Sequence, residues 1–255
     1  MITHVDQKTA ERLLAGAKDI FSLKIASNMK AYGSYDFFTV YGGKGILIGR
    51  YYDDLVIRTK GVISEDTMEE LSLFLKVCGF KSALAGIETG KRLMAAGWLN
   101  AEESLIYKFS SELIPEKEDI PEMEEINVNP ALDDVFSILQ DGFSGINYEN
   151  WYTDISHKIR HGVSSVYVYG DASATVMADI NGSVFISLVA TKRESRGKGE
   201  AKKLLRRLGI FFEKQGKEVS ILCKPELSPF YRKAGFYEGG KAITVFSEKI
   251  KNNIS

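Results

Sequence analysis

The sequence predicts a mixed α/β (α+β) fold, in which each of two consecutive domains has a mostly antiparallel sheet flanked by helices. Short runs of β-branched and aromatic residues alternate with longer segments in which apolar residues recur at helical spacing. Asn181-Gly182 lies between two of the short runs and is typical of a two-residue hairpin between antiparallel strands. An acidic stretch separates two similar series of elements, which indicates two domains.

The acidic stretch predicts where the domains divide. It contains Pro115 and Pro121, two of the 5 prolines, among many Glu and Asp residues, so it stays solvated and cannot bury apolar surface. We therefore expect an N-terminal domain over residues 1–110, a linker over 111–124 and a C-terminal domain over 125–255. The alternative interpretation is a surface loop inside one domain.

In the N-terminal half, apolar spacing predicts a long helix over Thr9–Asn28. Strands are expected over Asp36–Tyr41 and Gly45–Thr59, and a helix begins after Ser64. Three shorter segments follow, predicted as a strand, a helix and a strand: 83–86, 89–95 and 104–109.

The C-terminal half begins with a short strand over Glu125–Val128. Asn129 then caps a helix whose first residue is Pro130, and acidic residues in the first turn favour the helix dipole. The remaining expected elements are a helix over 149–160, strands over 166–170, 174–180 and 184–190, a helix from 201, a strand over 219–223, a short helix at Tyr231 and a strand near 242–246.

Composition disfavours several classes of function. The 33 basic and 34 acidic residues nearly cancel, which disfavours binding of nucleic acid or an anionic membrane through net charge. No apolar run could span a bilayer, and the N-terminus lacks a signal peptide. The chain has 2 cysteines, Cys78 and Cys223, which are far apart in sequence, as is typical of a cytoplasmic protein with reduced thiols. We expect both side chains in the core. We predict a cytoplasmic protein without nucleic-acid or membrane partners, and leave a homodimer open.

The most informative segment runs from Val184 to Leu205, where an apolar strand leads through a polar turn into an amphipathic helix. Gly197 and Gly199 let backbone amides converge without interference from a Cβ atom. The first turn of a helix has unpaired amides and partial positive charge, so it attracts phosphate. Arg196 adds a guanidinium that can bind phosphate through two hydrogen bonds. The segment therefore predicts an anion site.

Two common phosphate motifs do not fit this turn. A P-loop needs Gly-Lys-Ser/Thr after its glycines, whereas Glu200 follows Gly199. A dinucleotide fingerprint needs a third glycine where Lys202 stands.

A family pattern does fit. Arg196-x-x-Gly199-x-Ala201 resembles the Arg/Gln-x-x-Gly-x-Gly/Ala signature with which the GNAT N-acetyltransferase superfamily holds the coenzyme A pyrophosphate. Leu188–Thr191 resembles the family's central strand, and Ser228–Phe236 resembles its second signature, a short helix that carries a Tyr. The resemblance covers about residues 123–250.

The resemblance implies a GNAT-like fold and transfer of an acetyl group from acetyl-CoA to a primary amine of a small molecule or peptide, by direct attack and without a metal. It implies that Tyr231 is the general acid; a packing role beside Phe230 and Phe236 is the alternative. The implied donor-binding residues are Leu188, Val189, Ala190, Arg196, Gly197, Lys198, Gly199, Glu200 and Ala201. The aromatic residues Phe143, Tyr148, Trp151 and Tyr152 either bind the acceptor or belong to the core.

Several assignments stay open. The family often has a Glu base on the central strand; here Asp179, Glu226 or a water chain could serve. His157 and His161 have a spacing that can share a metal, but no third ligand is evident, so we expect a solvated helix face, with a substrate-facing role as the alternative.

The order of elements in the N-terminal half resembles a degenerate second copy of the same fold. Residues 60–64 stand where the glycine signature would be, and they contain one glycine and no Arg-x-x-Gly, so we expect no coenzyme A there. We expect this half to shape the acceptor pocket or to mediate assembly. The rival functions are a non-catalytic acyl-CoA-binding regulatory module and, less in keeping with the motifs, a peptide-binding structural module.

Overall fold

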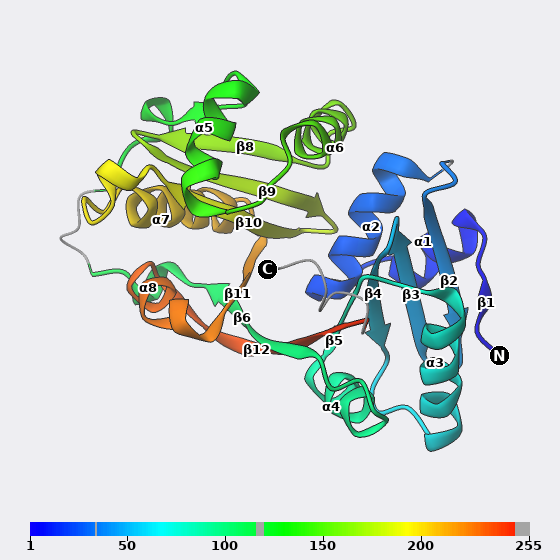
Figure 1. Cartoon of the computed structure of the whole chain (residues 1–255). Helices are drawn as coiled ribbons and strands as arrows, with labels where there is room; N and C mark the ends of the chain where they lie inside the picture. The colour runs from blue at the N-terminus through cyan, green and yellow to red at the C-terminus, as the bar shows by residue number, and fades with distance from the viewer. Residues whose placement is uncertain (34, 116–119, 248–255) are drawn as a thin grey trace. The chain divides into compact units, whose positions relative to one another are not determined.

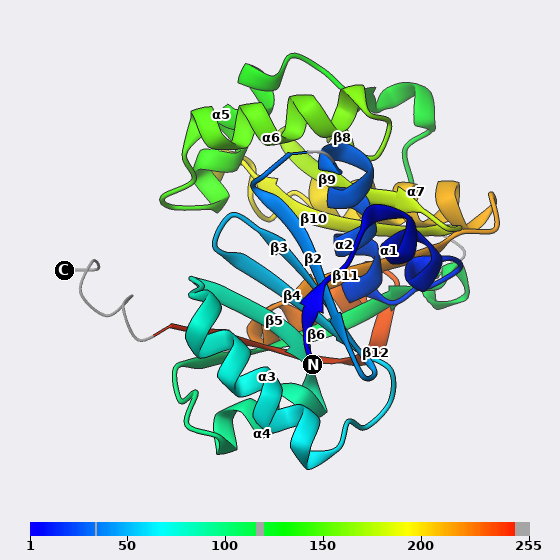
Figure 2. The ribbon, with the colours of Figure 1, turned by 90° about the vertical axis from the view of Figure 1, so that its right-hand side faces the viewer.

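The computed structural model describes residues 1–33, 35–115 and 120–247. The chain forms two compact units: unit 1 is Met1–Leu105 together with the segment from Gly240, and unit 2 is Ile106–Gly239. Both boundaries fall inside strands, β6 (Ala101–Phe109) and β12 (Phe236–Phe246). Figures 1 and 2 show the elements of each unit in two views.

Unit 1 contains one sheet whose strands follow the order β1-β2-β3-β4-β5-β12. Neighbours are antiparallel, except that β4 and β5 are parallel. Its elements, apart from β6 and β12, are β1 (Thr3–His4), α1 (Gln7–Leu14), α2 (Ile20–Tyr32), β2 (Phe38–Gly43), β3 (Ile46–Tyr51), β4 (Asp54–Thr59), α3 (Glu65–Cys78), β5 (Ser82–Gly86) and α4 (Ile87–Ala95).

Two predictions for this half are wrong. The expected helix over Thr9–Asn28 is two helices, because Gly16 takes a left-handed φ of 69° after α1 and Asp19 caps α2 by accepting the Ser22 amide at 2.9 Å. The expected strand over Gly45–Thr59 is the hairpin β3–β4, which turns at Tyr52 with a φ of 51°.

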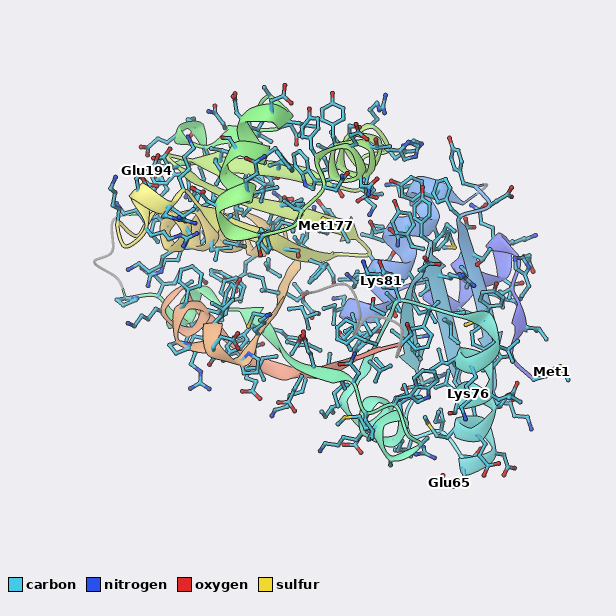
Figure 3. The ribbon with its side chains drawn as sticks, viewed as in Figure 1. Met1, Glu65, Lys76, Lys81, Met177 and Glu194 are labelled. Atoms are coloured by element: carbon cyan, nitrogen blue, oxygen red, sulfur yellow. The ribbon has the colours of Figure 1, made fainter. Side chains whose placement is uncertain are left out.

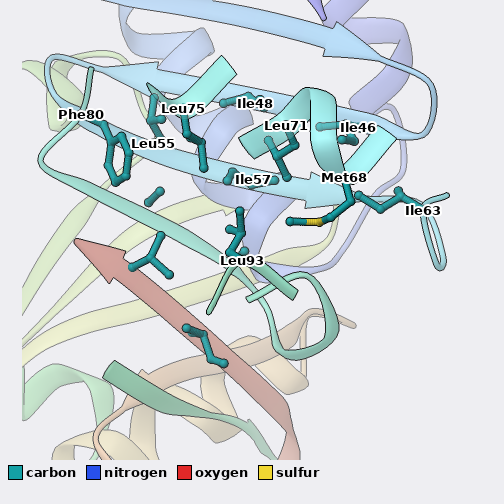
Figure 4. Close-up of a cluster of buried hydrophobic side chains, with 14 residues drawn as sticks. Ile46, Ile48, Leu55, Ile57, Ile63, Met68, Leu71, Leu75, Phe80 and Leu93 are labelled. Atoms are coloured by element: carbon teal, nitrogen blue, oxygen red, sulfur yellow. The ribbon is translucent and has the colours of Figure 1, made fainter. Parts of the chain in front are cut away.

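The main core of unit 1 lies between the sheet and the helices α3 and α4. Figure 4 shows Leu71 and Leu75 of α3 and Leu93 of α4 among the isoleucines of β3 and β4. Ile243 of β12 completes this core, and it packs so closely on α4 that a Cβ atom on Gly90 would lie 2.4 Å from it.

Unit 2 has the strand order β6-β11-β10-β9-β8-β7. The strands from β7 to β10 pair antiparallel, and β10 pairs parallel with β11. Its further elements are η1 (Ser111–Leu113), η2 (Met123–Glu125), β7 (Asn127–Val128), α5 (Leu132–Gly142), α6 (Tyr148–Arg160), β8 (Ser165–Tyr169), β9 (Ala172–Ile180), β10 (Ser183–Thr191), η3 (Arg193–Ser195), α7 (Glu200–Glu213), β11 (Glu218–Cys223), η4 (Pro225–Leu227) and α8 (Ser228–Lys233).

Helices cover both faces of the unit 2 sheet (Figure 1). On one face, Trp151 and Ile155 of α6 join residues of α5, β8 and β10 in a single apolar cluster. On the other face, the Phe212 ring of α7 lies edge-on to Tyr167 of β8, with ring centroids 6.3 Å apart.

The two units repeat one order of elements: a strand, two helices, three antiparallel strands, a helix, a parallel strand and a helix. The last strand of each series is exchanged. β6 follows the first series in sequence but lies beside β11, and β12 follows the second series but pairs with β5. The predicted fold class, a mixed and mostly antiparallel sheet flanked by helices, is confirmed.

The acidic stretch lies within unit 2, where η1 and η2 are short 3₁₀ turns and Ile126 is buried. Residues 116–119 of the predicted linker 111–124 lie outside the described residues. The compact units divide the chain inside β6 and β12, and the division into 1–110 and 125–255 remains a sequence prediction.

The predicted helix cap at Asn129 is wrong. Asn129 has a φ of 49°, and its side-chain oxygen accepts the Val166 amide at 2.8 Å. The side chain therefore joins β7 to β8, and α5 begins only at Leu132. No helix in the described part of the chain has the length and apolarity needed to cross a bilayer.

The exchanged strand β6 also packs on a glycine. A Cβ atom on Gly209 of α7 would lie 2.4 Å from the ring of Phe109. We expect Gly209→Ala to lower the free energy of unfolding by about 1–3 kcal/mol, because overpacking outweighs the gain of at most about 1 kcal/mol from alanine in a helix. Chemical denaturation measures the change.

Gly86→Ala is the matched control, because its Cβ atom would lie 3.8 Å from the nearest ring atom, an ordinary contact. If Gly209→Ala were as stable as the parent, the close packing of β6 on α7 would be contradicted.

Candidate functional site

The central feature of unit 2 is the point at which β10 and β11 stop pairing. Their parallel pairs run from Ser183–Glu218 to Ile186–Ile221. β10 continues to Thr191 and β11 to Cys223, so the ends of both strands extend past the last pair. Backbone groups there are available for partners other than the neighbouring strand.

β10 is also irregular on its other side. Its pairing with β9 shifts between Phe185 and Ile186 and again between Ser187 and Ala190. Leu188, inside the second shift, has a φ of 47°, a conformation that is uncommon for leucine. This β-bulge turns the backbone of Leu188 and Val189 out of the regular ladder, at the place where the sequence predicts donor binding.

The glycine turn, residues 196–201, follows β10 and η3 (Figure 3, where Glu194 marks η3). Gly197 and Gly199 both have a φ of 85°, and among the described residues no atom lies within 4 Å of a Cβ position built on either glycine. The space above both glycines is therefore open.

Helix α7 begins at this turn without a side-chain cap, because its cap residue is Gly199. The Lys203 amide donates to the Gly199 carbonyl at 3.0 Å. The amides of Glu200 and Ala201 lie earlier in the first turn than this helical hydrogen bond. Such first-turn amides carry the positive end of the helix dipole and favour an anion.

A side-chain network holds the residues before the turn. Ser195 is 1% exposed; its hydroxyl donates to Asp171 at 2.6 Å and accepts from Lys198 Nζ at 3.1 Å. Lys192 Nζ lies 3.5 Å from Asp171, and its amide donates to the Asp171 carbonyl at 3.0 Å. The Ser195 hydrogen bond, followed by the two lysine charges, lowers the pKa of Asp171 below its ordinary value of 3.8. No motif in the sequence analysis pointed to Asp171.

Arg196 is held beside α5. Its guanidinium donates to the Asp141 carbonyl and, at 3.4 Å, to the Thr191 carbonyl. The Asp141 carboxylate accepts the Arg193 amide at 2.7 Å. Asp141, near the end of α5, is thereby bonded to Arg193 at the start of η3 and to Arg196 just after it. These contacts hold Arg196 at the edge of the glycine turn.

The predicted donor residue Glu200 has a different side-chain contact. Its carboxylate accepts the Asp171 amide at 3.0 Å and lies against Gly170, where a Cβ atom would be 2.7 Å from Oε1. The side chain thus fixes the β8–β9 turn, and the backbone amide is the part of Glu200 at the helix start.

Tyr231 is only 6% exposed, and its ring packs edge-on to Phe230 and Phe236 with centroids 5.1 and 6.0 Å away. Burial, and then the nearby Cys223, raise the pKa of the Tyr231 hydroxyl. Burial, and then Glu226, raise the pKa of Cys223 to about 11. Tyr231 and Cys223 are therefore neighbours at the end of β11, where this strand has parted from β10.

The four predicted acceptor residues have different surroundings, and their role in binding an acceptor stays a prediction. Trp151 is buried in the core with α5, and Phe143 follows α5 and packs at the edge of that core. The Tyr148 hydroxyl donates to Asp133, and this bond raises the pKa of Tyr148 to about 12. Tyr152 lines a separate open pocket of about 340 Å³ between α6 and the residues that begin α5.

The open pocket lies away from β10. Its other lining residues are Asn129, Pro130, Leu132, Ser156, Ile159 and Arg160. The opposite end of α5 meets β10, since a Cβ atom on Gly142 would lie 2.9 Å from Ala190 Cβ. Ten residues of helix separate Leu132 from Gly142, about 15 Å at 1.5 Å per residue. Phe143 follows Gly142 directly, at the end of α5 that meets β10.

Two other predicted groups are engaged elsewhere. The Asp179 carboxylate accepts from Lys217 Nζ at 2.7 Å and lies opposite Val184, on the regular part of β10. His157 and His161 stack with ring centroids 4.1 Å apart, and His161 Nδ1 lies 2.9 Å from the His157 carbonyl. Within the described ranges, no group of three or more potential ligands could hold a metal.

The corresponding helix of unit 1 is built differently. α3 is capped by Ser64, whose hydroxyl accepts the Thr67 amide at 3.3 Å. Glu65, labelled in Figure 3, and Asp66 place negative charge in its first turn. The preceding hairpin β3–β4 pairs in one unbroken register from Ile46–Thr59 to Tyr51–Asp54. This helix start is therefore filled by the chain itself and disfavours an anion.

Comparison with known proteins supports the resemblance. Residues 140–246 match the family model described as an acetyltransferase (GNAT) domain. No curated protein matches the chain. A GNAT-family acetyltransferase from Colwellia psychrerythraea matches with 14% identity and a TM-score of 0.58, over 97% of this chain and 100% of that chain.

Two further solved structures are similar. A GCN5-related N-acetyltransferase from Sphaerobacter thermophilus has 14% identity and a TM-score of 0.59, over 96% of this chain and 94% of that one. A putative acetyltransferase from Pyrococcus horikoshii has 10% identity and a TM-score of 0.59, over 97% and 89%. At such identities the likeness shows a shared fold.

The network at the glycine turn can be tested through pH. Because the folded-state pKa of Asp171 is lowered, its charge stabilises the fold above the ordinary value of 3.8, and this contribution is lost as the pH falls through the lowered value. We expect Asp171→Asn to unfold at a lower temperature than the parent at pH 7, with the gap closing only below about pH 3.8.

Thermal unfolding across this pH range makes the comparison. Glu102→Gln, at an exposed position of β6, controls for the loss of one negative charge. A gap that stays constant down to strongly acidic pH would contradict the role given to the Asp171 carboxylate.

Proposed function

Because residues 140–246 match the acetyltransferase (GNAT) family model, we propose that the chain transfers an acetyl group from acetyl-CoA to a primary amine of a small molecule or peptide. One observation carries the proposal. The uncapped start of α7, with its two left-handed glycines under open space, directly follows a strand that is bulged and has parted from its parallel neighbour. An anion site and an exposed strand backbone are thus joined by one short turn.

In this proposal, acetyl-CoA is a substrate and the glycine turn holds its diphosphate. The open space fits, since a side chain at Gly197 or Gly199 would occupy it. Amides of residues 199–201 face the anion and Arg196 and Lys198 supply positive charge. The contacts of Arg196 with two backbone carbonyls and of Lys198 with a hydroxyl keep both cations at the turn until the anion arrives.

The backbone of Leu188, Val189 and Ala190 binds the extended arm of the donor and points an amide at the carbonyl oxygen of the thioester. Negative charge develops on that oxygen when the amine attacks, and a fixed amide stabilises it more strongly there than in water. The β-bulge supports this role, because it removes these residues from the regular pairing with β9.

The reaction forms one bond and breaks another. The amine nitrogen attacks the thioester carbonyl carbon, the carbon–sulfur bond breaks with its electron pair on sulfur, and the nitrogen loses a proton. Tyr231 gives a proton or a hydrogen bond to the leaving thiolate. Its raised pKa keeps the phenol protonated at neutral pH.

Cys223 indicates what a thiolate experiences at this place. Burial, and then Glu226, raise its pKa to about 11, because a charged thiolate is less well solvated there than in water. The same shift argues against Cys223 as a nucleophile, since it stays a thiol at neutral pH. Direct transfer to the amine is therefore the route we propose.

Glu226 is the better of the two candidate carboxylates for taking the amine proton. It lies close enough to Cys223 to raise the thiol's pKa, at the same strand end as Tyr231. Asp179 is paired with Lys217 beside the regular part of β10. A water chain serves equally well if the acceptor covers Glu226.

In this proposal the protein acts in the cytoplasm as a metal-free enzyme whose partners are acetyl-CoA and the amine. Cys78 and Cys223 are both free thiols, which suits a reducing compartment. Unit 1, whose corresponding helix start is capped and acidic, does not bind the donor. The rival function, a regulatory module that binds acyl-CoA without turnover, predicts saturable donor binding and no amine-dependent release of thiol.

Arg196→Glu tests donor binding. We expect the Kd for acetyl-CoA to rise by about 10- to 100-fold, because hydrogen bonds to charged groups contribute about 1.5–3 kcal/mol. Calorimetric titration of the purified chain measures it. Lys60→Glu makes the same charge change at an exposed residue between β4 and α3 and should leave the Kd unchanged. If both variants bound like the parent, the glycine turn would not be the donor site.

Tyr231→Phe tests the acid. It keeps the buried ring and removes the hydroxyl, so we expect kcat to fall by about 10- to 1000-fold while the Kd for acetyl-CoA stays the same. Thiol release with a panel of primary amines reports turnover. Unchanged turnover would leave Tyr231 with a packing role only.

A further inference from the structure

Strand β6 reaches unit 2 from the N-terminal series of elements and is anchored there by Phe109. The Phe109 ring packs on Phe236 with centroids 5.3 Å apart, and a Cβ atom on Gly235 would lie 3.1 Å from it. The next residue, Ser110, donates its amide to the Gly235 carbonyl at 3.0 Å. This end of β6 is therefore fixed against the turn that follows α8.

Two residues earlier on β6, Tyr107 is completely buried and hydrogen-bonds to both ends of α8. Its hydroxyl lies 2.7 Å from Ser228 Oγ and accepts from Arg232 Nε at 3.1 Å. With Arg232 as donor to the phenol oxygen, the hydroxyl can still either donate to Ser228 or accept from it. One hydroxyl thus connects the first residue of the helix with a residue one turn later.

α8 depends on such contacts. It has 6 residues, too few to be stable alone, and its cap residue Leu227 has an apolar side chain. Besides Tyr107, Arg206 of α7 donates to the carbonyl of Lys233 at the other end of α8. Tyr231 is on this helix, and its ring centroid lies 6.2 Å from that of Tyr107.

We propose that Tyr107 is a positioning residue, which fixes α8 so that the Tyr231 hydroxyl stays at the end of β11. The inference rests on the proposed acetyl transfer and on Tyr231 as its acid. It gives the N-terminal half an indirect part in catalysis, because this half supplies the strand whose tyrosine holds α8.

Tyr107→Phe isolates the hydroxyl. The ring and its packing remain, and Ser228 and Arg232 are partly or fully exposed, so water can replace the lost partner and the variant should fold. We expect kcat to fall by about 10-fold with an unchanged Kd for acetyl-CoA, because the acid is displaced while the donor site is intact. Tyr167→Phe is the control: Tyr167 is also buried in unit 2, and its hydroxyl bonds to Ser165 rather than to α8.

A double variant separates positioning from general stability. If Tyr107 acts through Tyr231, Tyr107→Phe should cost little once Tyr231 is already Phe. If Tyr107→Phe lowered kcat by the same factor in the parent and in Tyr231→Phe, the inference would be overturned. A kcat equal to that of the parent in both Tyr107→Phe and Ser228→Ala would overturn it as well.

Hydrogen exchange of the α8 amides provides a readout that does not need activity. We expect faster exchange in Tyr107→Phe than in the parent or in Tyr167→Phe, confined to α8. Unchanged exchange would overturn the positioning role. A parent protein that releases no thiol with any amine, yet shows the faster exchange in Tyr107→Phe, would instead remove the proposed function and keep the structural role.

Discussion

The candidate site depends on strand β10, which is paired with β9 along one edge but pairs with β11 over only part of the other edge. β10 stays bonded to β9 as far as Thr191, whereas its pairs with β11 end at Ile186. Buried backbone donors and acceptors are costly without partners, so a strand end of this kind favours an extended ligand that completes the ladder. The bulge at Leu188 and the glycine turn matter because they are placed around this gap.

Unit 1 shows what the same order of elements does without these local features. Its strand β4 runs in regular register with β3, and α3 begins with a serine cap and two acidic residues. The difference between a potential donor site and an ordinary helix start therefore lies in a few residues at the turn, while the sheet and helices around it are alike. Duplication of the fold has not duplicated the chemistry.

The sequence was sufficient wherever the determining residues are close together in the chain. The hairpin at Asn181-Gly182 and the glycine turn both follow from a few adjacent residues, and α7 begins within a residue of its predicted start. It failed where one residue breaks a periodic pattern, as at Gly16 and Tyr52. Long-range contacts gave no signal at all: Tyr107 meets Ser228 across 121 positions, and Asp171 meets Ser195 across 24.

The exchange of last strands has a consequence for how the molecule is made. Unit 1 needs β12, which is synthesised after the other strands, and unit 2 needs β6, which is synthesised before the rest of that unit. The other strands of both units are therefore synthesised before the first sheet can acquire its final strand, and the edge of β5 stays unpaired in the meantime. Neither half of the sequence encodes a complete folding unit, so recombination that separated the two halves would leave both with an open sheet.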